Sequence, residues 1–159
     1  MARMTGSWLS GPTAALPKKP YGAEPDKFRG ESLGLPQSGP GSLVPTGRRV
    51  GALMIDWLMA AGVSAAFLGS NAFGGALSTI TLLVWFVVGV AAVTISSFTP
   101  GQFFLGISVA RIDGPVKVGF VRALARSLLL VFVVPAVITD ADGRGMHDRA
   151  TGTALVRTR

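Results

Sequence analysis

The sequence contains no cysteine, and this absence removes several classes of function together. A disulfide framework, a thiolate metal site and a cysteine nucleophile are all excluded. The single histidine, His147, has no serine nucleophile motif to accompany it. Glycine-rich patterns that bind nucleotide phosphates are also missing. We therefore expect a protein that is not an enzyme, with no catalytic residue, no metal site and no cofactor.

Charge is scarce as well. Charged residues make up 14% of the chain and hydrophobic residues 49%, with a mean hydropathy of +0.51. This composition is typical of a small membrane protein, so the lipid bilayer is the first partner we expect. The excess of fifteen Lys and Arg over eight Asp and Glu is spread along the chain without interleaved aromatic residues. Nucleic acid is therefore not an expected partner.

Proline is rare outside the N-terminal part of the chain. Seven of the ten prolines lie in residues 1–45, together with many glycines and serines. No helical or strand period is visible there, and no apolar run is long enough for a signal peptide. We expect residues 1–45 to form a disordered cytoplasmic tail and residues 46–159 to form a membrane domain.

Long apolar runs begin only after this tail. Residues 50–69 contain one charge and residues 76–98 contain none. At about 1.5 Å per residue, both runs can cross a hydrocarbon core of roughly 30 Å. A third segment, 118–139, reaches that length only by including two arginines, so it either spans or turns back as a re-entrant helix. The predicted fold class is an all-α, small helical membrane protein.

The loop after the second apolar run has its own pattern. Phe103, Phe104 and Ile107 predict a short amphipathic helix on the membrane surface. Beyond them, apolar residues at 107–109 and 116–118 flank a Gly-Pro turn, which indicates either a small β-hairpin or a plain interfacial loop.

Basic residues predict the orientation. They stand directly before the first helix and again after the second, which places the N-terminus and the central loop in the cytoplasm of a multi-pass protein of the cell membrane. The C-terminal tail is also basic. A spanning third helix places that tail outside, whereas a re-entrant helix returns it to the cytoplasm, and both arrangements remain open.

Asp56 is the one charge inside the first apolar run. Moving an ionised carboxylate out of water without a partner costs several kcal/mol or more, so we expect a nearby group to neutralise it. Arg126 enters the third helix to a similar depth and is the first candidate partner. Arg122, one turn shallower, is the second.

An Asp56–Arg126 pair has two interpretations. In the structural one, the pair fixes the register of two helices, and the protein has a structural or accessory role. In the functional one, Asp56 exchanges a proton or cation, and the protein is a transporter or a subunit of one. The structural interpretation is favoured because a nearby arginine keeps a carboxylate ionised. A transporter this small needs further copies of itself or other membrane proteins to enclose a path.

Four separate motifs together resemble the RDD family of small membrane proteins. They are Arg49 followed by Asp56, the stretch "TPGQFFLGISVARIDG", Arg126, and "HDRATGTALV". The family is named for an arginine and two aspartates, and the resemblance implies that these are Arg49, Asp56 and Asp148. It also implies a role for Gly101 and Gly106, whereas Gln102 stands where a lysine is common. Transport has been suggested for some members of a largely uncharacterised family.

The resemblance leads to one expectation about the tail. Two charges of one family motif are most simply explained as neighbours, so we expect Asp148 to meet Arg49 at the start of the first helix. That contact requires the third segment to turn back.

Overall fold

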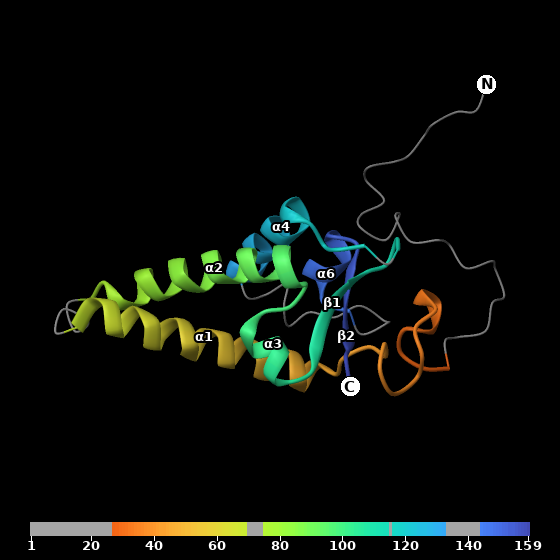
Figure 1. The fold of residues 1–159 in the computed structure, drawn as a ribbon. Helices are drawn as coiled ribbons and strands as arrows, with labels where there is room; N and C mark the ends of the chain where they lie inside the picture. The colour runs from red at the N-terminus through yellow and green to blue at the C-terminus, as the bar shows by residue number, and fades with distance from the viewer. Residues whose placement is uncertain (1–26, 70–74, 115, 133–143) are drawn as a thin grey trace, which may run out of the picture.

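The computed structural model describes residues 27–69, 75–114, 116–132 and 144–159. Two long antiparallel helices, α1 (Thr46–Leu68) and α2 (Leu77–Ser96), extend away from a cap of shorter elements (Figure 1). We use "cap" for α3 (Pro100–Phe104), β1 (Ile107–Arg111), α6 (Met146–Ala150) and β2 (Thr153–Arg157). The prediction of two long apolar helices is confirmed.

α1 and α2 are long and apolar enough to cross a membrane, and most of their apolar surface is exposed. Phe67, for example, is 84% exposed. A helix in the core of a soluble protein would bury such a side chain, so the exposed surface suits contact with lipid. The face of α1 that packs inward is narrow and carries small or polar side chains, which are Arg49, Ala52, Asp56, Ala60 and Ser64.

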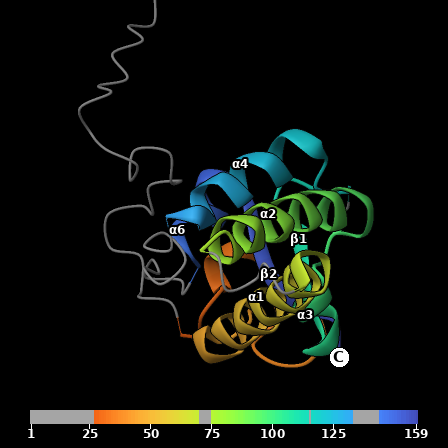
Figure 2. The same ribbon diagram turned by 90° about the vertical axis from the view of Figure 1, so that its left-hand side faces the viewer.

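α4 (Phe120–Val131) lies against α2, on the side away from α1 (Figure 2). Its twelve residues correspond to about 18 Å of helix, roughly half a hydrocarbon core. The predicted third helix, 118–139, therefore begins two residues later than expected, after Gly119. The last part of the predicted helix, residues 133–139, lies outside the described residues.

α3 begins with a capping box. The Thr99 hydroxyl accepts a hydrogen bond from the backbone N–H of Gln102, and the side-chain carbonyl of Gln102 accepts one from the backbone N–H of Thr99. These reciprocal bonds satisfy two donors at the helix start and stabilise a helix of only five residues. Phe103 and Phe104 are exposed on it, as the predicted surface helix requires. Ile107 does not belong to this helix, because it is buried in β1.

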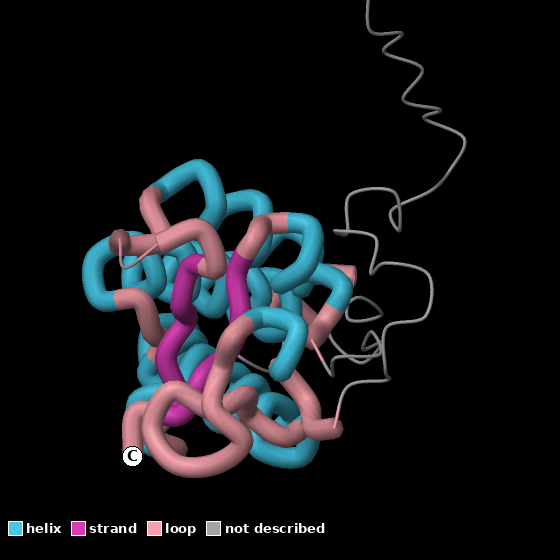
Figure 3. Tube along the Cα trace, turned by 90° about the vertical axis from the view of Figure 1, so that its right-hand side faces the viewer, coloured by secondary structure: helices cyan, strands magenta, loops and turns pink. Residues whose placement is uncertain are grey.

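A two-stranded antiparallel sheet forms the centre of the cap (Figure 3). β1 pairs with β2 so that Val109 lies opposite Leu155, and both side chains are buried. The all-α prediction is therefore wrong for the cap. Of the two alternatives for the loop after the second apolar run, the local hairpin does not form, because β1 pairs with β2 near the C-terminus and not with residues 116–118.

The folded domain begins earlier than residue 46. Val44 N–H donates to the Leu155 carbonyl at 2.9 Å, and Arg157 N–H donates to the Ser42 carbonyl at 2.9 Å. Ser42 and Val44 are each only 2% exposed. Residues 41–44 thus extend the edge of β2, with a short 3-10 helix, η3 (Glu31–Leu33), preceding them. The tail was predicted to run to residue 45, and the structure shows that residues 41–44 of it pair with β2 of the cap.

The cap places both ends of the domain together. Because β2 pairs with β1 and also with residues 41–44, the C-terminal segment lies at the end of the helix pair where α1 begins (Figure 1). Of the two arrangements that the sequence left open, the same-side one requires this proximity of the C-terminal segment to the start of α1.

Candidate functional site

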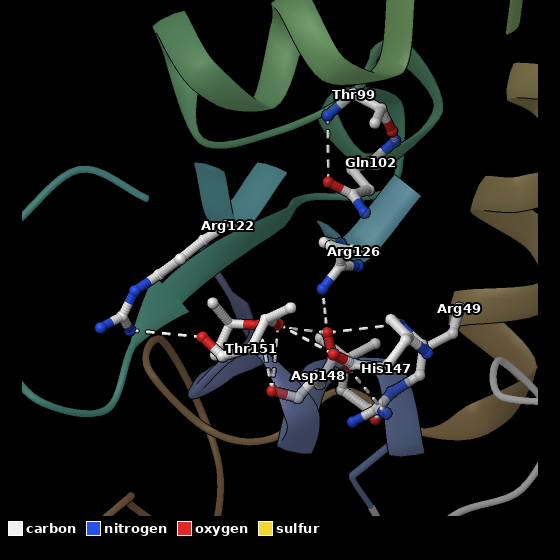
Figure 4. A network of polar contacts seen from close by, with 10 residues as sticks. Arg49, Thr99, Gln102, Arg122, Arg126, His147, Asp148 and Thr151 are labelled. Atoms are coloured by element: carbon white, nitrogen blue, oxygen red, sulfur yellow. Dashed lines mark hydrogen bonds and ion pairs between the residues drawn. The ribbon is translucent and has the colours of Figure 1, made fainter. Parts of the chain in front are cut away.

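A buried carboxylate, Asp148, lies at the centre of a charge cluster at the base of the helices (Figure 4). Arg126 Nη1, from α4, donates to its Oδ1 atom. Arg49 Nη1, from α1, lies 3.5 Å from its Oδ2 atom. His147 Nε2 lies 3.3 Å from Oδ1. The sequence prediction that Asp148 meets Arg49 is confirmed, and Arg126 is added to the pair.

Neutral groups complete this cluster. Thr153 of β2 donates its hydroxyl towards Asp148 at 3.4 Å, and Thr151 lies 3.0 Å from the Thr153 hydroxyl. Arg49 Nε also donates to the Val44 carbonyl at 3.0 Å. Asp148 is fully buried and Arg49 is 3% exposed, so a charge that lost its partner here would remain out of water. The cluster thereby links α1, α4, α6 and β2.

Asp56 has different partners from those we predicted. Its Oδ2 atom accepts from the Thr99 hydroxyl at 2.5 Å, and its Oδ1 atom accepts from the Gly101 N–H at 2.7 Å. The prediction that Arg126 pairs with Asp56 is wrong. Asp56 and Arg126 do lie at a similar depth along their helices, as predicted, since both line one cavity. The Arg126 guanidinium instead forms its ion pair with Asp148 in the cap.

Arg122 is not a partner of Asp56 either. Its Nη2 atom lies 2.9 Å from Asp113 Oδ2, and its Nη1 atom donates to the Thr151 carbonyl at 3.3 Å. Arg111 donates to the same carboxylate from β1. Hydrogen bonds from Arg111, with the positive charges of both arginines, hold the pKa of Asp113 well below its usual range. Asp113 was not among the predicted site residues, although its position between two arginine-bearing segments was a signal for this contact.

Gly101 explains how α3 comes so close to α1. A Cβ atom at this position would lie 2.2 Å from the Ala52 carbonyl oxygen and 3.0 Å from Asp56 Cγ. Only glycine allows the backbone N–H to reach the Asp56 carboxylate at this separation. Gly106 has a different task, because its φ of 63° turns the chain from α3 into β1. The backbone geometry therefore explains why glycine occupies both positions.

A cavity of about 90 Å³ lies beside Asp56, between α1, α2 and α4. Thr99, Gln102, Arg126 and Ser127 give it a polar end, and the remaining walls are mostly apolar. Within the described ranges, no group of three or more His, Asp or Glu residues is placed to hold a metal ion.

Two lipid-facing helices joined to a cap by buried charges define a small helical membrane protein. The RDD family model matches residues 43–152, and the chain belongs to this family. Searches of curated proteins and of solved structures gave no match. The resemblance noted in the sequence is confirmed. The match begins at residue 43, within the segment that pairs with β2, in agreement with the earlier start of the folded domain.

Proposed function

We propose that this protein has a structural or accessory role in the cell membrane, with its N-terminus and cap in the cytoplasm. The exposed basic residues Arg48 and Lys117 support this orientation, because both lie near the cap end and positive charge favours the cytoplasmic side. Other copies of the chain or other membrane proteins are the partners that such a role requires.

One observation carries the proposal: donors from the chain itself satisfy both buried aspartates. Asp56 accepts two hydrogen bonds from the start of α3, and Asp148 is held by Arg49 and Arg126. Carboxylates bound in this way hold elements together, and buried ion pairs are best known for fixing geometry. The charged motif therefore fastens the cap to the membrane helices.

Cation or proton exchange through Asp56 is the second candidate. The cavity beside Asp56 supports it, because an intramembrane carboxylate next to an open space is a common feature of ion pathways. Against it, the Thr99 and Gly101 donors must be released before Asp56 takes up a cation.

Flux measurements in proteoliposomes distinguish the two candidates. The full chain is reconstituted with fluorescent reporters of internal Na⁺ and pH, beside the Asp56→Asn variant and the matched control Asp113→Asn in the exposed loop. We expect the wild type to match protein-free liposomes. Flux in the wild type and in Asp113→Asn that disappears in Asp56→Asn would overturn the structural proposal.

A further inference from the structure

Two polar side chains at one end of the cavity carry atoms that form no hydrogen bond within the described part of the chain. Gln102 uses its side-chain carbonyl for the Thr99 N–H, but its amide nitrogen makes no hydrogen bond to any described residue. The Ser127 hydroxyl makes no hydrogen bond to a described residue either. By contrast, Ser64 and Thr94 on the long helices donate to the carbonyls four residues earlier.

These two groups call for an occupant. Gln102 is 4% exposed and Ser127 is 5% exposed, and both line the cavity. Within the described residues, neither Gln102 Nε2 nor Ser127 Oγ is among the fully enclosed side-chain atoms that lack a partner, so both keep surface that faces the cavity and can form a hydrogen bond there. A molecule in the cavity that accepts a hydrogen bond would satisfy both.

The charges around the cavity select an uncharged head group. Asp56 lines it from α1 and Arg126 lines it from α4. An anionic head would meet like charge at Asp56, and a cationic head would meet like charge at Arg126. A hydroxyl avoids both conflicts, since it accepts from the Gln102 amide and donates to Ser127 or to an Asp56 oxygen.

The rest of the space suits a hydrocarbon chain. Beyond the polar end, the cavity is walled by apolar residues, among them Val63, Val84 and Trp85. A second cavity of about 230 Å³ shares Leu53, Trp85 and Leu130 with the first. Its other lining residues, Met54, Trp57, Leu82 and Val131, are all apolar or aromatic. Several of them are exposed on lipid-facing helix surfaces, so a chain can enter from the bilayer.

We propose that the two cavities together bind one hydroxyl-bearing lipid, with its hydroxyl at Gln102 and Ser127 and its chain running past Trp85. The shared chemistry is a single uncharged hydroxyl on a long apolar body. This site does not rest on the proposed structural role, because its two anchoring atoms, Gln102 Nε2 and Ser127 Oγ, take no part in the ion pairs or in the α3 capping box.

Tryptophan quenching tests the site directly. The full chain is placed in phosphatidylcholine nanodiscs with Trp8, which lies outside the described residues, replaced by phenylalanine. Trp57 and Trp85, whose ring centroids are 6.1 Å apart, then report on the cavities. The probe is ω-bromoundecanol, with ω-bromoundecanoate and ω-bromoundecyl trimethylammonium as anionic and cationic probes of the same chain. We expect saturable quenching by the alcohol at concentrations about tenfold lower than for either charged probe.

Three variants decide between a site and simple partition into the bilayer. Ser127→Ala should weaken the alcohol about fivefold through one lost hydrogen bond. Gly89→Leu should remove the saturable component, because a Cβ at Gly89 points to within 3.8 Å of Ser127 Oγ. Ser78→Ala, at an exposed position of α2 away from both cavities, should change nothing.

Other results would overturn the proposal. Equal, non-saturating quenching in all variants would mean partition only. Tighter binding of a charged probe would assign the cavity to a different class of ligand. If Gly89→Leu lowers the unfolding temperature, Ser127→Ala alone decides whether the lipid site exists. It removes a hydroxyl that lines the cavity and removes no hydrogen bond between described residues.

Discussion

Arg49 Nη1 lies 3.5 Å from Asp148 Oδ2, although the two residues are 99 positions apart in the chain. Arg49 occupies the first turn of α1, and Asp148 lies in α6 just before β2. Their contact brings the C-terminal segment back to the start of the membrane helices. Arg126 binds the same carboxylate from α4, so one aspartate holds three helices in a fixed relation (Figure 4).

Removing the Asp148 charge should be costly. Asp148→Asn leaves Arg49 and Arg126 buried without an anionic partner, and breaking a buried pair in this way typically costs about 3–5 kcal/mol. The free energy of unfolding in detergent micelles measures the loss. The matched control is Asp113→Asn, which removes an aspartate bound by two arginines at the exposed surface, where little change is expected. Equal stability of the two variants would contradict the buried cluster's role.

Gly101→Ala should separate α3 from α1. The added methyl would lie 2.2 Å from the Ala52 carbonyl oxygen, so the backbone must move and the Gly101 bond to Asp56 must lengthen. We expect a loss of about 1–3 kcal/mol in the free energy of unfolding. Gly47→Ala is the control, because a Cβ at Gly47 meets no atom within 4 Å. The contact between α3 and α1 would be unimportant if both alanine variants matched the wild type.

Cysteine labelling should show the cap on one side of the membrane. The chain contains no cysteine, so single replacements at Gly75, Lys117 and Thr158, all outside the interior, report without background. With a membrane-impermeant maleimide on intact cells, we expect labelling at position 75 only, and labelling at 117 and 158 after permeabilisation. Labelling of positions 158 and 75 together on intact cells would place the C-terminal tail outside the cell and contradict a cytoplasmic cap.

Local features of the sequence were enough to predict α1 and α2. A run of about twenty apolar residues with at most one charge forms a helix in lipid whatever the rest of the chain does. The contact between Arg49 and Asp148 could also be predicted, because both residues belong to one family motif. The sheet could not be predicted, because β1 and β2 are five-residue strands separated by residues 112–152, which include α4 and α6. Pairing over such a distance has no local signal.

The partners of Asp56 were not predicted, for a different physical reason. The predicted partner was an opposite charge, but the carboxylate accepts hydrogen bonds from a hydroxyl and a backbone N–H. The sequence did hold a signal: Thr99 and Gln102 have the spacing of a capping box, and Gly101 lies between them. A helix start with a glycine at that place offers neutral donors to a nearby carboxylate. That alternative removes the need for an arginine.

The central claim is that Arg126 holds the cap through Asp148 and not through Asp56. Two double-mutant cycles on the free energy of unfolding test it most directly, one pairing Arg126→Gln with Asp148→Asn and the other pairing Arg126→Gln with Asp56→Asn. We predict a coupling of about 1–3 kcal/mol in the first cycle, because the two side chains share a buried ion pair, and near additivity in the second. Additive losses for Arg126 and Asp148, with strong coupling between Arg126 and Asp56, would contradict the account.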